Sequence, residues 1–147
     1  MHKLLESLTS AYAVSGDERR LHDLLREATA GLVTEIHETP LGNLLAVRRG
    51  QSSDHSILFA AHLDEVGGWV TRVNDKGFLG IHCRSVDPRV WPGQQVVVHG
   101  TRPLEGIIGL KPVHVMSREE LERPLPMEEL WVDVGLPRNE VEACVPI

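Results

Sequence analysis

A histidine and an aspartate two positions apart are the strongest candidates for chemistry in this 147-residue sequence. His62 and Asp64 directly follow Ser56–Ala61 (SILFAA), an apolar run with the pattern of a strand covered on both faces. Ligands of open α/β sheets collect outside the carboxyl ends of strands, so this position favours a site. A metal-bound imidazole needs its second ring nitrogen held by a carboxylate or a carbonyl, and Asp64 is near enough in sequence to do this.

By itself this spacing is more typical of a solvated hydrogen-bonded pair, because a zinc site needs at least three protein ligands. The adjacent carboxylates Glu119–Glu120 and Glu128–Glu129 are interpreted as a solvated acidic face. Six further histidines stand at no ligand-like spacing and are interpreted as surface or core residues: His22, His37, His55, His82, His99 and His114.

Helices are predicted over the first 30 residues. Leucines between residues 4 and 8 form one short apolar face, and a second apolar face recurs at helical spacing over 21–28. Before it, Ser15 and Glu18 predict a capping box, in which the serine hydroxyl accepts a backbone amide hydrogen bond and the glutamate reaches back to the cap residue. Gly31 then ends the second helix.

The rest of the chain predicts mainly strands, and its composition shifts near residue 67. A brief capped turn is expected at Ser117–Glu120, and a last helical turn or two at 138–144. Residues 1–66 thus predict an α/β segment, and residues 67–147 a β-rich barrel or sandwich. The expected strands lie near 33–37, 43–48, 56–61, 69–73, 78–82, 94–99, 105–110 and 130–134.

Composition excludes several classes of protein. Fifteen Lys and Arg against 21 Asp and Glu give a net charge of −6, which disfavours nucleic-acid and anionic-membrane binders. No apolar run approaches the ~20 residues of a membrane helix, and the N-terminus lacks the apolar region of a secretory signal. Two cysteines, Cys83 and Cys144, are too few for a disulfide framework, so a reducing cytoplasmic location is expected.

Short motifs follow one another in a recognisable order along the chain. They are LT and VSGDE within 8–18, LGNL at 41–44, AHLDEVG at 61–67, GFL at 77–79, VDP and PGQQV within 86–96, GIIG and KPVH within 106–114, and LWVDVG at 130–135. As an ordered set they resemble the glutamyl-aminopeptidase and tetrahedral-aminopeptidase family of two-metal exopeptidases. The resemblance extends from residue 4 to about residue 144.

The resemblance implies a fold and two site residues. Residues 1–66 would be the N-terminal portion of a peptidase-type α/β catalytic domain, and residues 67–147 an incomplete, barrel-like (PDZ-like) dimerisation domain. His62 matches the family's first metal-binding histidine, and Asp64 matches the active-site aspartate that orients it. Glu65 matches too, with a structural role expected where the two domains meet.

The resemblance also implies peptide substrates, two divalent ions (zinc or cobalt) and a homo-oligomer. The family's remaining ligands and its catalytic Glu-Glu pair lie beyond the barrel, and Glu119–Glu120 and Glu128–Glu129 are not their counterparts. We therefore expect a truncated chain that alone binds no metal tightly and is inactive, unless a separate C-terminal segment completes the site. The alternative is a non-catalytic oligomerisation module built on the barrel. An old endoglucanase label in the family suggests carbohydrate chemistry, which the scarcity of aromatic residues disfavours.

Overall fold

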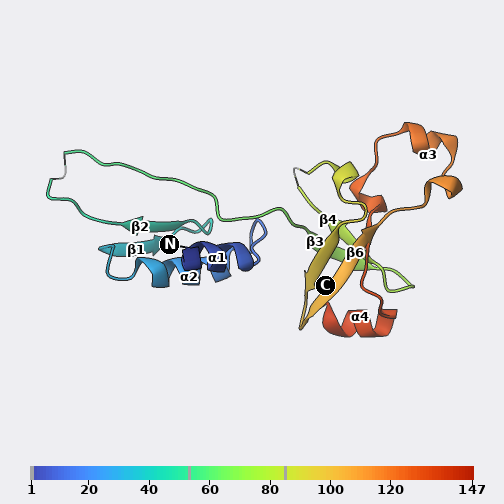
Figure 1. The fold of residues 1–147 in the computed structure, drawn as a ribbon, viewed down its shortest axis with the longest axis horizontal. Coiled ribbons are helices and arrows are strands. Elements are labelled where there is room, and N and C mark those ends of the chain that lie inside the picture. Colours follow the sequence, from blue (N-terminus) through green and yellow to red (C-terminus); the bar gives the residue numbers. More distant parts are fainter. Residues whose placement is uncertain (1, 53, 85) are drawn as a thin grey trace. The chain divides into compact units, whose positions relative to one another are not determined.

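The computed structural model describes residues 2–52, 54–84 and 86–147. The chain divides into two compact units, Met1–Gly67 and Gly68–Ile147 (Figure 1). Each is described by itself below, as unit 1 and unit 2. None of the helices formed by the described residues is long and apolar enough to cross a membrane.

Unit 1 contains two helices and a β-hairpin. Helices α1 (His2–Ser10) and α2 (Arg19–Thr29) lie where the leucine spacing predicts helices, and they contact each other. Strands β1 (Glu35–Glu38) and β2 (Leu44–Val47) pair antiparallel, which confirms both predicted strands. Among the described residues of unit 1, only three are buried: Ala13, Leu21 and His22. Unit 1 therefore has little core of its own.

The predicted capping box at Ser15–Glu18 is wrong. The N-cap of α2 is Glu18, and it makes no side-chain cap hydrogen bond. Residues 14–17 instead form a turn, in which the Asp17 amide donates to the Val14 carbonyl at 2.9 Å and Gly16 has a φ of 92°. That positive φ is the type II turn conformation and cannot continue into a helix, so α2 begins too late for Ser15 to cap it.

The predicted buried strand Ser56–Ala61 is also wrong for this chain. The segment has no strand partner among the described residues, and its large side chains are exposed: Ile57 by 82%, Leu58 by 83% and Phe59 by 91%. A strand of this composition needs hydrogen-bonding neighbours and apolar cover on both faces. Within unit 1, β1 and β2 pair with each other instead of with this segment. The segment has the apolar composition of a buried strand, but among the described residues no strand pairs with it and its large side chains are not covered.

Unit 2 is built on a five-stranded antiparallel sheet. Its strands are β3 (Trp69–Val73), β4 (Leu79–His82), β5 (Gln95–His99), β6 (Pro103–Gly109) and β7 (Trp131–Asp133), in the order β3-β4-β7-β6-β5. All five lie where the turn signals predict strands. The expected barrel is a half-barrel. Strands β3 and β5 are the two edges of the sheet, and in the described part of the chain they do not pair with each other to close it. Short 3-10 turns lie at Pro88–Val90, Val113–Val115 and Met127–Glu129, and the helices are α3 (Arg118–Glu122) and α4 (Arg138–Cys144).

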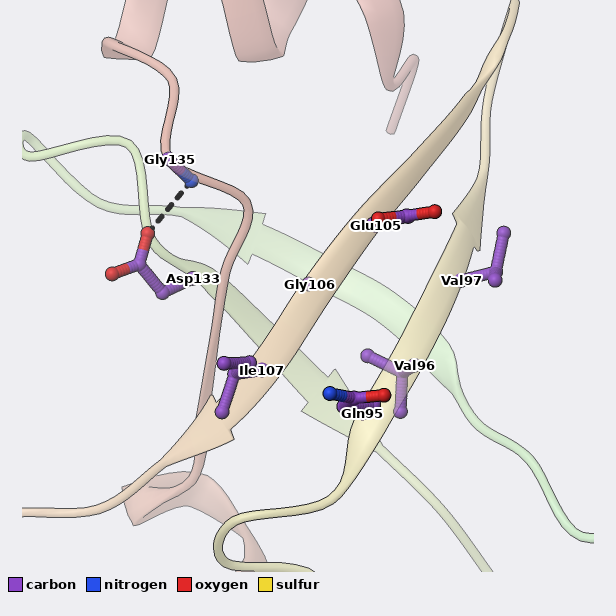
Figure 2. A pocket seen from close by; sticks show the side chains of 8 residues that line it. All are labelled: Gln95, Val96, Val97, Glu105, Gly106, Ile107, Asp133 and Gly135. Carbon is purple, nitrogen blue, oxygen red and sulfur yellow. Dashed lines mark hydrogen bonds between the residues drawn. The ribbon is translucent and has the colours of Figure 1, made fainter.

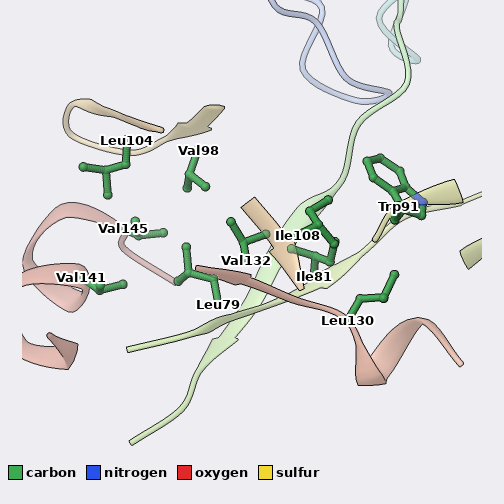
Figure 3. Close-up of a cluster of buried hydrophobic side chains, with 10 residues drawn as sticks. All are labelled: Leu79, Ile81, Trp91, Val98, Leu104, Ile108, Leu130, Val132, Val141 and Val145. Carbon is green, nitrogen blue, oxygen red and sulfur yellow. The ribbon is translucent and has the colours of Figure 1, made fainter. Parts of the chain in front are cut away.

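One face of this sheet carries the core of unit 2. Side chains of β6 alternate, with Leu104 and Ile108 buried and Glu105 and Ile107 exposed. Helix α4 adds Val141, which is fully buried. Ten buried residues form one cluster (Figure 3): Leu79, Ile81, Trp91, Val98, Leu104, Ile108, Leu130, Val132, Val141 and Val145. Unit 2 therefore has the core of an independently packed body.

The predicted capped turn at Ser117–Glu120 is confirmed and begins α3. The Ser117 hydroxyl accepts from the Glu120 amide at 3.2 Å, and the Glu120 carboxylate accepts from the Ser117 amide at 2.6 Å, which completes a capping box. Lys111 Nζ also donates to Glu120 Oε1 at 2.7 Å. The Lys111 hydrogen bond, followed by that from the Ser117 amide, lowers the pKa of Glu120 to about 2.

Removing a core side chain should destabilise unit 2 without affecting unit 1. We expect Leu79→Ala to lower the free energy of unfolding by about 2–5 kcal/mol, because Leu79 is fully buried and its loss leaves a cavity. Val113→Ala is the control, with an expected cost of about 1 kcal/mol or less, since Val113 is exposed in unit 2 and lies outside the core cluster. Urea unfolding followed by tryptophan fluorescence reports on unit 2, which contains all three tryptophans. Equal losses in the two variants would contradict this assignment of the core.

The Glu120 contacts predict an acid-sensitive contribution to stability. The pKa of Glu120 is about 2 in the folded chain, below its ordinary value of 4.5, so the stabilisation is fully present above pH 4.5 and is lost as the pH falls towards 2. Glu120→Gln should therefore remove part of the pH dependence of unfolding in this window. Glu119→Gln, which leaves the Lys111 contact intact, should keep that dependence. A carboxyl NMR titration of Glu120 with a midpoint near 4.5 would refute the prediction.

Candidate metal centre

His62 and Asp64 form a side-chain pair on the surface of unit 1. The imidazole Nδ1 of His62 lies 3.0 Å from the backbone carbonyl oxygen of Asp64 and 3.1 Å from its Oδ1. Both oxygens only accept hydrogen bonds, so these contacts require a proton on Nδ1. In the neutral ring the lone pair is then on Nε2, the atom left free to bind a metal. The side chain of His62 is 86% exposed, so Nε2 is accessible.

Asp64 has a second partner, which the sequence analysis did not find. The Ser15 hydroxyl donates to Asp64 Oδ2, across 49 positions of sequence. The pKa of Asp64 is lowered mainly by this hydrogen bond; partial desolvation opposes the shift, and the hydrogen bond from His62 adds to it. Asp64 is therefore a carboxylate at neutral pH. No local pattern reveals this contact, because Ser15 stands three residues before Glu18, which is the spacing of a helix capping box.

The backbone explains why residues so far apart meet. Val14 and Glu65 form an isolated parallel bridge, and the Glu65 amide donates to the Ala13 carbonyl at 2.7 Å. Gly67 permits this close approach, because a Cβ at that position would lie 2.2 Å from Val14 Cγ1. Glu65 thus contributes its backbone to the site.

The donor set of this pair is that of one metal ligand and its orienting carboxylate. Within the described ranges, no three His, Cys, Asp or Glu side chains come together to hold a metal ion. His62 and Asp64 nevertheless fit a metal site chemically, since a ligating histidine commonly donates its other ring nitrogen to a carboxylate or a carbonyl. The two residues would therefore be one part of a larger ligand set.

The remaining candidates of the sequence analysis have other partners. His22 is buried, with Nδ1 3.8 Å from Glu38 Oε1. Of the two acidic pairs, Glu120 contacts Lys111 and Glu129 contacts Arg123. These carboxylates are engaged in ion pairs, which agrees with their interpretation as a surface feature.

A hollow of about 570 Å³ lies on the outer face of unit 2. Figure 2 shows it over β5 and β6, lined by Gln95, Val96, Val97, Glu105, Gly106, Ile107, Asp133 and Gly135. Its lining includes no histidine or cysteine, and Asp133 Oδ1 accepts a hydrogen bond from the Gly135 amide at 2.8 Å. Val97 and Ile107 are each about half exposed there. The hollow therefore combines half-exposed apolar side chains with the polar groups of Gln95, Glu105 and Asp133.

Comparisons with known proteins agree with the motif order. The chain is 32% identical to "Putative aminopeptidase FrvX" of Escherichia coli (strain K12), over 95% of this chain and 40% of that protein. Among solved structures, the TET aminopeptidase of the archaeon Thaumarchaeota archaeon SCGC AB-539-E09 aligns with a TM-score of 0.87 and 27% identity, over 99% of this chain and 42% of that one. The TET1 peptidase of Pyrococcus horikoshii, described as assembling into a tetrahedron or a large octahedral shell, aligns with a TM-score of 0.76 and 28% identity, over 97% and 43%.

The chain thus spans about 40% of the length of the relatives that it matches. The model of the M42 glutamyl aminopeptidase family matches residues 42–147, which include the His62–Asp64 pair and all of unit 2. The family resemblance of the motifs is confirmed, and the chain belongs to the M42 glutamyl aminopeptidase family.

Proposed function

We propose that this chain is the N-terminal portion of a metal-dependent aminopeptidase, which removes residues from the N-terminus of peptides. The observation that carries the proposal is the orientation of His62, whose Nδ1 faces Asp64 while Nε2 has no hydrogen-bond partner in the described part of the chain. The motif that contains this pair lies inside the family match, and the relatives are named aminopeptidases.

Two divalent ions, zinc or cobalt, would polarise the scissile carbonyl and lower the pKa of a water molecule when bound. His62 would hold one ion through Nε2. Asp64 would keep Nδ1 protonated and raise the basicity of the ring. The Asp64 carboxylate would also compensate part of the positive charge, since its pKa is lowered and it stays ionised.

The 147 residues alone would not form this site. One imidazole is a weak ligand, and a zinc site needs at least three protein ligands. The exposed segment Ser56–Ala61 directly precedes His62 and lacks strand partners among the described residues. In a complete assembly, we expect further family residues to pair with this segment and to supply the other ligands. These further residues would come from the part of the relatives that this chain does not match.

Reconstitution tests the proposed function. With added Zn²⁺ or Co²⁺, the chain alone should not hydrolyse aminoacyl substrates, whereas co-expression with the unmatched part of a relative such as FrvX should restore hydrolysis. In the restored assembly, His62→Ala should lower activity by about 100-fold or more, because a ligand is lost. His114→Ala is the matched control and should leave activity unchanged, since His114 lies in a surface 3-10 turn of unit 2. Turnover by the chain alone, or full activity of His62→Ala, would overturn the proposal.

A second candidate function is self-assembly through unit 2. The observation that favours it is the hollow over β5 and β6, where Val97 and Ile107 present half-exposed apolar side chains. The assembly described for the Pyrococcus horikoshii relative is consistent with such a role. On this proposal, unit 2 would act as the dimerisation domain whether or not the catalytic site is complete.

Sedimentation velocity tests this second candidate. The chain should sediment as an oligomer, and the double variant Val97→Asp/Ile107→Asp should sediment as a monomer, because two carboxylates would be buried without partners at the contact. Val113→Asp, at an exposed valine outside the hollow, is the control and should leave the oligomer intact. A chelator and His62→Ala should also have no effect. A monomeric wild-type chain, or an oligomeric double variant, would exclude assembly through this face.

A further inference from the structure

We propose that Ser15 is a positioning residue for His62 and acts through Asp64. The inference deepens the proposed function and rests on it. Three side chains form a series: the Ser15 hydroxyl donates to Asp64 Oδ2, and Asp64 Oδ1 faces His62 Nδ1 at 3.1 Å. Each carboxylate oxygen of Asp64 thus has a different partner.

This division of partners restrains the rotation of the carboxylate. A terminal aspartate torsion has a broad, roughly two-fold energy profile, so an unrestrained carboxylate turns easily. Asp64 is about one-third exposed, and water competes for its oxygens. With Ser15 holding Oδ2, Oδ1 stays directed at the imidazole, and Nδ1 keeps its proton. The consequence is at the opposite side of the ring, where Nε2 keeps the lone pair that a metal requires.

The Ser15 hydroxyl is itself held in place by the backbone. Ser15 is the second residue of the turn closed by the Asp17 amide and the Val14 carbonyl, and Gly16 supplies the positive φ that the turn needs. The parallel bridge between Val14 and Glu65 fixes this turn beside the segment that carries Asp64. The series is therefore supported by backbone contacts within this chain.

The Ser15 hydroxyl does not cap helix α2. The helix begins at Arg19, and its N-cap, Glu18, makes no side-chain cap hydrogen bond. The Glu18 carboxylate instead accepts from the Gly16 amide at 2.9 Å. The hydroxyl that the local pattern assigns to a helix cap is thus used for Asp64. A serine or threonine hydroxyl can donate in this way, whereas an alanine or valine side chain cannot.

The protonation of the His62 ring tests the proposal without metal or peptide. In the 147-residue chain labelled with ¹⁵N-histidine, long-range ¹H–¹⁵N correlation spectra show which ring nitrogen carries the proton, at a pH where the ring is neutral. His62→Gln identifies the signals of His62 among the eight histidines. We expect the Nδ1–H form in the wild type. In Ser15→Ala, the ratio of the Nδ1–H form to the Nε2–H form should fall by about fivefold, as the loss of one net hydrogen bond produces.

Matched variants separate positioning from folding. Ser15→Thr and Ser15→Val have nearly the same shape and differ in the hydroxyl, so the threonine variant should keep the wild-type ratio and the valine variant should lose it. Ser10→Ala, at an exposed serine of α1, is the control and should change nothing. Protection of the Glu65 amide from hydrogen exchange reports whether the Ala13 contact persists.

Equal ring protonation in the threonine and valine variants would overturn the proposal, even if Ser15→Ala unfolded unit 1. An Nε2–H form in the wild type would also overturn it. Both measurements of ring protonation are made on the 147-residue chain without reconstitution. A failure of the proposed hydrolysis is therefore distinguishable from a failure of this inference. In an active reconstituted assembly, Ser15→Val should also weaken Zn²⁺ affinity by about 10-fold or more relative to Ser15→Thr.

Discussion

The backbone pairing of Ala13 and Val14 with Glu65 is the constraint on which the site depends. It joins a turn near the N-terminus to the segment that carries His62 and Asp64. Without a Cβ at Gly67, the two segments approach closely enough for the Ser15 hydroxyl to meet the Asp64 carboxylate. A short-range contact between two backbones thus orders side chains that are far apart in sequence.

The same distinction between local and distant contacts explains what the sequence could predict. The strands of unit 2 follow from alternating side chains and turn residues, such as the buried and exposed positions of β6, which are local signals. The AHLDEVG motif likewise placed His62 and Asp64 side by side. The Ser15 contact was missed because its partner is 49 positions away, and the strand at Ser56–Ala61 was predicted without the partners that a strand requires.

The two units differ in how much of their stability is internal. Unit 2 buries ten residues in one cluster, which includes side chains from its strands, its loops and α4. The described part of unit 1 buries three, while Ile57, Leu58 and Phe59 remain exposed. At roughly 25 cal/mol for each Å² of apolar surface removed from water, covering those three side chains would contribute several kcal/mol. Additional contacts would therefore increase the free energy of unfolding of unit 1 more than that of unit 2.

That imbalance connects stability to chemistry, because His62 directly follows the exposed segment. Strands that covered Ile57–Phe59 would also restrict the backbone entering His62, while the Glu65 pairing already restricts the backbone leaving it. On the proposed function, burial of the segment and completion of the metal site would be coupled, because the free energy of metal binding adds to that of folding. The Ser15–Asp64–His62 series would then be the part of the site that is ordered first, and the remaining ligands would be added to it.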